Sequence, residues 1–353
     1  MKKGLTILLI LLMVLGISTF AFAAKKIGVA MPTQSLQRWN QDGANMKAQL
    51  EAEGYIVDLQ YANNNVATQV SQIENMILGG CDILVIASID GSSLGTVLKI
   101  AKEEGIPVIA YDRLIMETDA VSYYATFDNY MVGTIQGTYI KDVLNLDSRT
   151  ADDPVYMEFF GGSPDDNNAR YFFGGAWDVI KPYIDKGVVV VPSGQTEFEQ
   201  IATLEWDSAR AQARMDNLIA AHYSAGQRLD AVLCSNDSTA LGVTNSLSGA
   251  GFDKNNFPYI TGQDCDIANT KNIIAGYQSM SIFKDTRTLA AQVVKMIKAI
   301  SEGKEPEINN TTDYHNGVKI VPTYLCEPVF ADINNYKELL IDSGYYTPEQ
   351  LGL

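Results

Sequence analysis

Short apolar runs alternate along the chain with longer stretches whose apolar residues recur at helical spacing. Val70, Ile73 and Ile77 recur in this way within residues 66–78, and the glycine pair that follows is a usual helix end. Residues 36–53 likewise form a helical stretch that stops at a glycine. Short strands that alternate with helices predict βαβ units and a parallel sheet. We therefore expect an α/β protein.

The pattern occurs twice, which predicts two doubly wound parallel-sheet lobes. One set of strand candidates lies near residues 27, 56, 83, 107 and 123, and a second lies near residues 155, 188, 231, 259 and 277. A helical stretch and an apolar run follow both sets, at residues 285–301 and 318–325. We expect the chain to return to the first lobe and then to cross back, forming a multi-strand hinge beside a ligand cleft. The predicted division is residues 24–127 plus 284–320 for the N-terminal lobe, and residues 128–283 plus 321–353 for the C-terminal lobe.

The first residues have the features of an export signal. Lys2 and Lys3 precede an almost wholly apolar stretch over residues 5–20, and Ala21-Phe22-Ala23 supplies a small-residue cleavage pattern. A single membrane anchor is the alternative, but the apolar stretch is short and runs directly into the cleavage pattern. We predict a signal peptide at residues 1–23 and a periplasmic mature chain without membrane insertion.

The charge and the cysteines exclude several classes of function. The chain has 42 acidic and 26 basic residues, and its net charge of −16 opposes nucleic acid or an anionic membrane surface as a partner. The four cysteines lie far apart without metal-ligand spacing, and an oxidising compartment would permit one bridge, most plausibly Cys234–Cys265. The only two histidines, His222 and His315, oppose a histidine-based zinc site or a Ser-His triad. We expect no catalytic residues, no cofactor and no metal.

Polar side chains follow six of the apolar runs. Such runs lead into Arg38-Trp39, Asp112-Arg113, the 161–168 turn, Asn236-Asp237, Asp264 and Lys284. Ligands bind at the carboxyl ends of strands in open α/β sheets, so these groups predict one site. Carboxylates, guanidinium groups and amides suit a rim of hydroxyls, and tryptophan suits an apolar ring face. The predicted ligand is a polyhydroxylated small molecule.

Each of these residues also has a purely structural interpretation. Asp112-Arg113 could form only a turn or an ion pair between the lobes, and Asn167 or Asn168 could cap a helix. Trp206 could be a core residue, and Lys284 could lie on a solvated face. Spacing alone leaves both interpretations open.

Several of these motifs together resemble one family. In order, they are residues 27–32 (IGVAMP), 110–113 (AYDR), 124–129 (YATFDN), 161–168 (GGSPDDNN), 235–237 (SND) and 262–264 (GQD). The chain resembles periplasmic sugar-binding proteins of ABC importers, especially those for xylose and for several monosaccharides such as galactose, glucose and arabinose. The resemblance covers essentially the whole chain and implies a type I periplasmic binding protein fold that closes on one monosaccharide.

The resemblance also implies the ligand-binding residues. Arg38 would donate hydrogen bonds to the sugar, while Trp39 and Trp206 would stack on its ring. The remaining polar contacts would come from Asp112, Arg113, Asp166, Asn168, Asn236, Asp264 and Lys284. Asn236 resembles the xylose branch and most of the surrounding sequence resembles the multiple-sugar branch, so the particular sugar stays open.

The leading hypothesis is a monomeric, non-catalytic receptor that delivers a monosaccharide to the membrane subunits of an ABC importer. An alternative is a receptor that presents its closed form to a chemoreceptor or sensor kinase. A secreted glycosidase would need an acid and a base or nucleophile that flank a scissile bond, and no carboxylate stands out for that role. A sugar-responsive repressor is opposed by the signal peptide, the acidic charge and the lack of a helix-turn-helix segment.

Overall fold

The computed structural model describes residues 24–224 and 227–353, so the predicted signal peptide lies outside the described residues. The first lobe contains a six-stranded, all-parallel sheet in the order β11-β5-β4-β3-β1-β2. The strands are β1 (Lys26–Met31), β2 (Ile56–Tyr61), β3 (Ile83–Ile86), β4 (Val108–Tyr111), β5 (Val121–Phe127) and β11 (Thr323–Cys326). The helices are α2 (Gln37–Ala52), α3 (Val66–Leu78), α4 (Gly95–Glu103) and α11 (Thr286–Ser301).

Apolar side chains bury both faces of this sheet. Trp39 and Met46 of α2 and Val293 of α11 pack on one face, whereas α3 and α4 cover the other with Ile73 and Leu98. Near-continuous apolar strands such as Ile83–Ile86 are typical of a parallel sheet that is covered on both faces.

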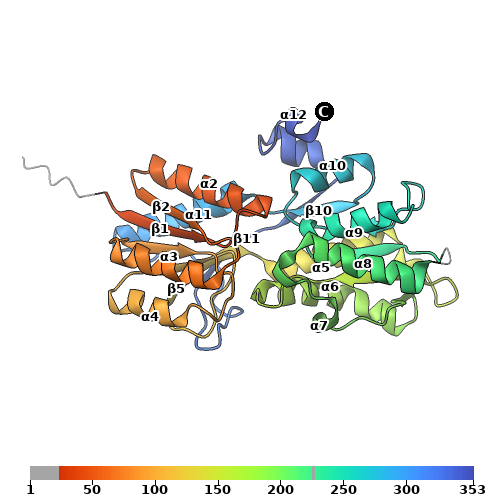
Figure 1. Cartoon of the computed structure of the whole chain (residues 1–353), viewed down its shortest axis with the longest axis horizontal. Helices are drawn as coiled ribbons and strands as arrows, with labels where there is room; N and C mark the ends of the chain where they lie inside the picture. Colours follow the sequence, from red (N-terminus) through yellow and green to blue (C-terminus); the bar gives the residue numbers. More distant parts are fainter. Residues whose placement is uncertain (1–23, 225–226) are drawn as a thin grey trace, which may run out of the picture.

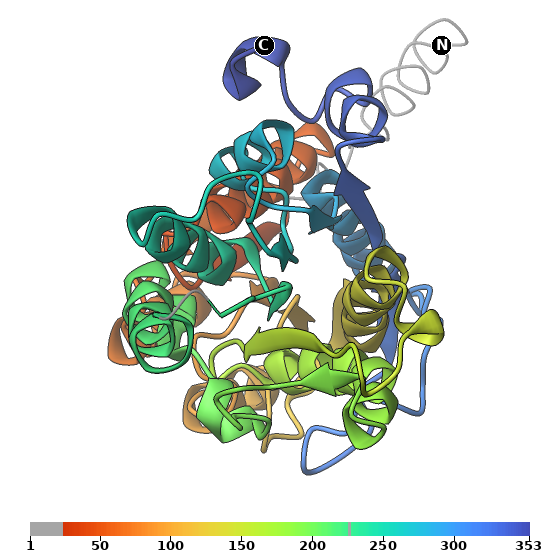
Figure 2. The ribbon, with the colours of Figure 1, turned by 90° about the vertical axis from the view of Figure 1, so that its right-hand side faces the viewer.

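The second lobe repeats this design with an antiparallel edge. Four parallel strands lie in the order β7-β6-β8-β9, and a bridge between Gln263 and Ile282 places the antiparallel pair β10-β12 beside them. The strands are β6 (Val155–Phe160), β7 (Val189–Val190), β8 (Ala231–Cys234), β9 (Tyr259–Ile260), β10 (Met280–Phe283) and β12 (Val329–Asp332). Helices surround these strands in the end-on view (Figure 2).

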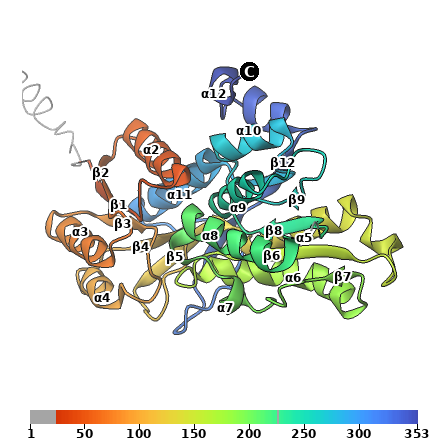
Figure 3. The ribbon, with the colours of Figure 1, turned by 45° about the vertical axis from the view of Figure 1, so that its right-hand side comes forward.

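The longer helices of this lobe are α5 (Asn129–Val143), α6 (Asn167–Asp185), α8 (Ser208–Leu218), α9 (Asp237–Gly249) and α10 (Ile267–Ala275). The shorter helical segments are η1 (Leu146–Ser148), α7 (Phe198–Ile201), η2 (Leu204–Trp206), η3 (Ile219–Tyr223), η4 (Lys337–Asp342) and α12 (Pro348–Leu351). The C-terminal segment that carries η4 and α12 packs against α10, where Tyr346 and Leu351 share an apolar cluster with Ile274 (Figure 3).

The chain crosses between the lobes three times (Figure 1). It leaves the first sheet after β5, returns between β10 and α11, and crosses again between β11 and β12. The predicted fold class, two parallel-sheet lobes joined by several strands, is confirmed. The predicted boundary at residue 320 differs from the strand pairing, because β11 pairs with β5 in the first sheet. Leu325 and Cys326 of this strand pack into the two apolar clusters on either face of that sheet, so the last crossing follows Cys326.

The lobes touch in a closed arrangement at points outside the central pocket described below. Gln37 of α2 donates from Nε2 to the Tyr346 hydroxyl at 2.7 Å and accepts from the Ile267 backbone N–H at 3.1 Å. On the opposite side, the Tyr171 hydroxyl of α6 donates to the Asp313 carbonyl at 3.1 Å. These contacts join the first lobe to the second outside the pocket.

Two further findings concern the membrane and the cysteines. Within residues 24–224 and 227–353, no helix is both long enough and apolar enough to cross a membrane. All four cysteines lie in the described part of the chain, and they are buried and unpaired. The permitted bridge between Cys234 and Cys265 is therefore not formed. The Cys265 thiol instead lies 3.6 Å from the Ser281 carbonyl, which it can reach as a weak donor.

Helices α5 and α6 approach each other closely at Gly175. A Cβ atom at Gly175 would lie 2.1 Å from the Tyr130 carbonyl oxygen, whereas one at Gly174 would lie 3.8 Å from its nearest neighbour, the Tyr130 ring. Gly175→Ala should therefore destabilise the protein by about 1–3 kcal/mol, because the backbone of α5 must move. Gly174→Ala on the same helix should be neutral or stabilising, because alanine favours a helix over glycine. Thermal or urea unfolding checks this, and equal midpoints for the two variants would contradict the tight helix contact.

Candidate ligand-binding site

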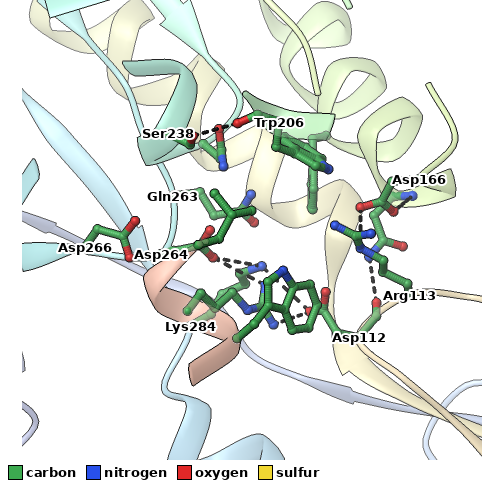
Figure 4. A pocket seen from close by; sticks show the side chains of 15 residues that line it. Asp112, Arg113, Asp166, Trp206, Ser238, Gln263, Asp264, Asp266 and Lys284 are labelled. Carbon is green, nitrogen blue, oxygen red and sulfur yellow. Dashed lines mark hydrogen bonds and ion pairs between the residues drawn. The ribbon is translucent and has the colours of Figure 1, made fainter. Parts of the chain in front are cut away.

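A pocket of about 430 Å³, a volume that includes open solvent space, lies between the lobes at the carboxyl ends of the strands. All ten predicted site residues line it, including Trp206, which only the family resemblance had suggested (Figure 4). The five lining residues that the sequence analysis missed are Leu36, Phe172, Ser238, Gln263 and Asp266. Ligand binding by the ten residues stays a prediction at this point.

Arg38 is the centre of the charge network on the first-lobe side. Its Nε donates to Asp42 at 2.9 Å, its Nη1 donates to Asp264 of the second lobe at 3.3 Å, and its Nη2 donates to Asp112. Burial lowers the pKa of Arg38, but the carboxylates of Asp112, Asp42 and Asp264 outweigh burial and raise it well above its usual value. The guanidinium is therefore held permanently charged in a buried position.

Asp42 holds Arg38 in place from behind. It lies one helical turn after Arg38 on α2, is fully buried, and also accepts from the Tyr111 hydroxyl. The i, i+4 spacing of Arg38 and Asp42 was the available sequence signal for this support, because residues so spaced are neighbours on a helix.

The backbone at Asp112 positions the next two site residues. Asp112 follows β4 and has a φ of 60°, and its carbonyl accepts from Asn168 Nδ2 and from the Tyr124 hydroxyl, both at 2.6 Å. Burial raises the pKa of the Asp112 carboxyl, but Arg38 and Lys284 outweigh that effect and lower it. Arg113 forms an ion pair with Asp166 of the second lobe, with 3.0 Å between Nε and Oδ2. Asp112-Arg113 is thus both a turn and part of an interlobe ion-pair network that faces the pocket.

On the second-lobe side of the pocket, two of the polar side chains come from residues that cap the N-termini of helices. Asp166 caps α6 by accepting from the Asn168 backbone N–H at 3.0 Å, so the cap is Asp166 rather than Asn167 or Asn168. Asn236 caps α9 in the same way through the Thr239 backbone N–H. Both caps keep a polar side chain at the lobe edge, where it also lines the pocket.

Lys284 is buried, so the solvated alternative for it is wrong. Its Nζ lies 3.2 Å from Asp264 and 3.8 Å from Asp112, and it follows β10 at a crossing between the lobes. The ammonium group thus neutralises carboxylates from both lobes at a point where the chain crosses between them.

Two tryptophans come from opposite lobes. Trp39 of α2 has the guanidinium carbons of Arg38 and Arg113 at 4.9 Å and 5.0 Å from its ring centroid. Trp206 lies in a left-handed turn, with a φ of 56°, and its carbonyl accepts from the Ser238 hydroxyl at 2.6 Å. A Cβ atom at Gly162 would lie 1.9 Å from the Trp206 ring, so only glycine leaves room for the ring there.

The sequence matches a known protein family over most of its length. A model of the periplasmic binding protein domain matches residues 27–305. The chain belongs to this family of periplasmic binding proteins. The predicted resemblance is confirmed.

Named relatives of this periplasmic binding protein agree with the family. It is 49% identical over 344 residues to the multiple sugar-binding periplasmic receptor ChvE of Rhizobium radiobacter, with 96% of each chain covered. It is 37% identical over 327 residues to the D-xylose-binding periplasmic protein of Escherichia coli, with 92% of each chain covered. An ABC transporter solute-binding protein from Clostridium phytofermentans, solved with bound β-D-glucose, is 66% identical with a TM-score of 0.90. That match covers 93% of this chain and 100% of the other.

The binding protein also contains a partly buried carboxyl group, that of Asp266, which forms no ion pair with any described Arg, Lys or His. Asp266 follows two residues with positive φ, Asp264 and Cys265, and its backbone N–H donates to Asp237 at 2.8 Å. Burial and the charge of Asp264 raise the pKa of Asp266 to about 7. Asp237 itself accepts from Gln278 Nε2 and from the Ser281 hydroxyl, and burial raises its pKa well above the usual value.

Asp266 therefore predicts a pH dependence of stability in the unliganded protein. The pKa of Asp266 is higher in the folded state than the usual 3.8. Proton binding by Asp266 therefore contributes to the stability of the folded state. This contribution is fully present below about pH 4 and is lost as the pH rises through about 7. Asp266→Asn cannot ionise, so its melting temperature should fall less than that of the wild type between pH 5 and pH 8. Exposed Asp152→Asn is the charge-matched control. Parallel melting curves for wild type and Asp266→Asn would contradict the raised pKa.

Proposed function

We propose that this protein captures a monosaccharide in the periplasm and delivers it, chemically unchanged, to an ABC-type sugar importer. The observation that carries the proposal is one pocket between two lobes, lined by tryptophans and paired charges from both. Residues 1–23 would direct export, and the strands that cross between the lobes would form the hinge.

The chemistry of the lining supports a sugar. A pyranose has apolar C–H faces and a rim of hydroxyl groups. Trp39 and Trp206 supply large, rigid apolar surfaces for the faces. Asp112, Asp166 and Asn168 retain hydrogen-bonding capacity for hydroxyls while their charges or dipoles are already balanced by protein partners. A neutral polyol is therefore favoured, because its hydroxyl groups can form hydrogen bonds with these three side chains. A ligand that displaced their protein partners and left one of them without a partner would bind less well.

The relatives support the same class of ligand. One is named a multiple sugar-binding receptor and another a D-xylose-binding protein, and the 66% identical structure holds β-D-glucose. A second solved relative from Chloroflexus aurantiacus, 32% identical with a TM-score of 0.83, holds D-glucose. Xylose, galactose, glucose and arabinose are the sugars to test, with D-glucose first.

The closed arrangement supports delivery rather than catalysis. A receptor signals its load only if the ligand stabilises the closed form more than the open form, and residues from both lobes line this pocket. Glycoside hydrolysis would need an acid and a second carboxylate across a scissile bond. Asp112, Asp166 and Asp264 are instead each paired with Arg or Lys, so Asp266 has no second unpaired carboxylate in the lining to act with it.

A second candidate function is that of a sensor partner. The relative from Rhizobium radiobacter is named a receptor. The closed form of the present chain could accordingly be recognised by a chemoreceptor or a sensor kinase. Measuring sugar uptake in a deletion strain separates the two roles. Uptake is lost if the protein serves the importer and continues if the protein serves only a sensor.

Sugar binding should raise the melting temperature in proportion to the logarithm of ligand concentration well above the dissociation constant. A thermal-shift screen over D-glucose, D-galactose, D-xylose and L-arabinose checks this, followed by calorimetry on the best ligand. Unchanged amounts of free sugar after incubation would support the non-catalytic role. The proposed function fails if no monosaccharide shifts the melting temperature.

Arg113→Ala should weaken binding of that sugar by about 2–4 kcal/mol, because it removes a donor and leaves Asp166 buried without its cation. Exposed Arg210→Ala, on α8, is the control and should bind as the wild type does. Isothermal calorimetry measures both. Near-normal affinity of Arg113→Ala would remove Arg113 from the site.

Gly162→Ala should also weaken binding, because its Cβ displaces the Trp206 ring. The control is Gly161→Ala, whose Cβ would meet only side-chain atoms of Ile201 and Phe198, at 3.2–3.4 Å. Calorimetry and tryptophan fluorescence should separate the two variants. The predicted role of Trp206 fails if both bind with the same affinity.

A further inference from the structure

Two oxygen atoms at one end of the pocket have no hydrogen-bond donor. They are Oε1 of Gln263 and Oδ1 of Asp266, and both atoms are buried. Both residues line the pocket and belong to the second lobe. Buried acceptors are normally satisfied, so each of these requires a partner that the protein does not provide.

The amide of Gln263 is oriented by its neighbours. Only 2% of the residue is exposed, and its Nε2 donates to the Ser235 carbonyl at 3.1 Å. A flipped amide would place two carbonyl oxygens against each other, so Nε2 must face Ser235 and Oε1 must be the free end. Figure 4 shows the side chain extending into the space beneath Trp206. Gln263 therefore presents an acceptor, and not a donor, to the pocket.

Asp266 supplies a second free acceptor in the same lining. Its backbone is held at both ends, because its N–H donates to Asp237 at 2.8 Å and its carbonyl accepts from Thr270 at 2.7 Å. In Figure 4 its carboxyl group points toward Asp264 and Gln263. No described cation lies within 4 Å of its carboxyl group, in contrast to the other three carboxylates of the lining.

Each cation of the pocket already lies in an ion pair, although Arg113 Nε has no hydrogen-bond acceptor. Arg38 serves Asp42, Asp112 and Asp264, Arg113 serves Asp166, and Lys284 serves Asp264 and Asp112. Three cations thus face four lining carboxylates, with the Asp42 carboxylate directly behind Arg38. A ligand that brought a further negative charge would find no free cation among the described lining residues.

We propose that Gln263 and Asp266 form an acceptor corner that takes a hydroxyl donor of the sugar and excludes a carboxylate. The site then selects neutral monosaccharides against the corresponding uronic acids. This inference rests on the proposed function, because it specifies which sugars the same pocket accepts. Its physical basis is that sugar hydroxyls can each donate a hydrogen bond to one of the free acceptors, whereas a carboxylate has no proton to donate and meets Asp264 and Asp266.

The test compares two matched pairs, D-glucose with D-glucuronate and D-galactose with D-galacturonate, by calorimetry at pH 8, where the Asp266 carboxyl, whose pKa is raised to about 7, is mostly ionised. The wild type should bind at least one neutral sugar about tenfold or more tightly than its uronate. Asp266→Asn removes the charge and adds a donor, so it should narrow that ratio about fivefold or more. Gln263→Met keeps the size but removes the acceptor, and it should weaken the neutral sugar about tenfold. Exposed Asp152→Asn is the control and should leave every value unchanged.

The outcomes separate this inference from the proposed function. Neutral sugar binding with equally tight uronate binding overturns the acceptor corner and leaves the proposed function intact. The corner is also overturned if the ratio stays the same in Asp266→Asn and the neutral affinity stays the same in Gln263→Met, with circular dichroism showing both variants folded. Absence of binding by any monosaccharide overturns both proposals.

Discussion

The buried guanidinium of Arg38 is the interaction on which the site depends. It joins Asp42 on its own helix, Asp112 after β4, and Asp264 on the opposite lobe. A charge taken out of water in this way is tolerated only when its partners are in place. One of those partners, Asp264, belongs to the opposite lobe, so the network depends on the lobes lying together as they do in this structure.

Much of the fold and of the site followed from the sequence because two rules are purely local. Helical spacing that ends at glycines marked α2 and α3 correctly, and their alternation with apolar runs implied parallel sheets. The carboxyl ends of parallel strands meet at one edge, so polar residues such as Asp112, Asn236 and Lys284 were placed together without knowledge of the strand order.

The failures have an equally physical origin. The lobe to which β11 belongs depends on which core its side chains fill, and an apolar run of that length suits either sheet. Asp266 lies two residues beyond the strand-end residue Asp264, and two consecutive positive φ angles turn the chain back toward the pocket. Such turns are not encoded by glycine here, so no residue type announced them. Gln263 resembled part of an apolar run, and only its buried, one-sided amide gives it a role.

Gln37, Ile267 and Tyr346 draw the lobes together without lining the pocket, and this has a consequence for signalling fidelity. A ligand in the pocket would not contact these three residues, because none of them lines it. A stronger contact would increase apparent affinity, since less of the ligand's binding free energy would be spent on shutting the lobes. It would equally raise the fraction of ligand-free molecules in the closed form. A membrane partner that recognises the closed form would then distinguish less well between ligand-free and ligand-bound molecules. The two hydrogen bonds of Gln37 thus affect both the affinity for ligand and the fraction of ligand-free molecules in the closed form.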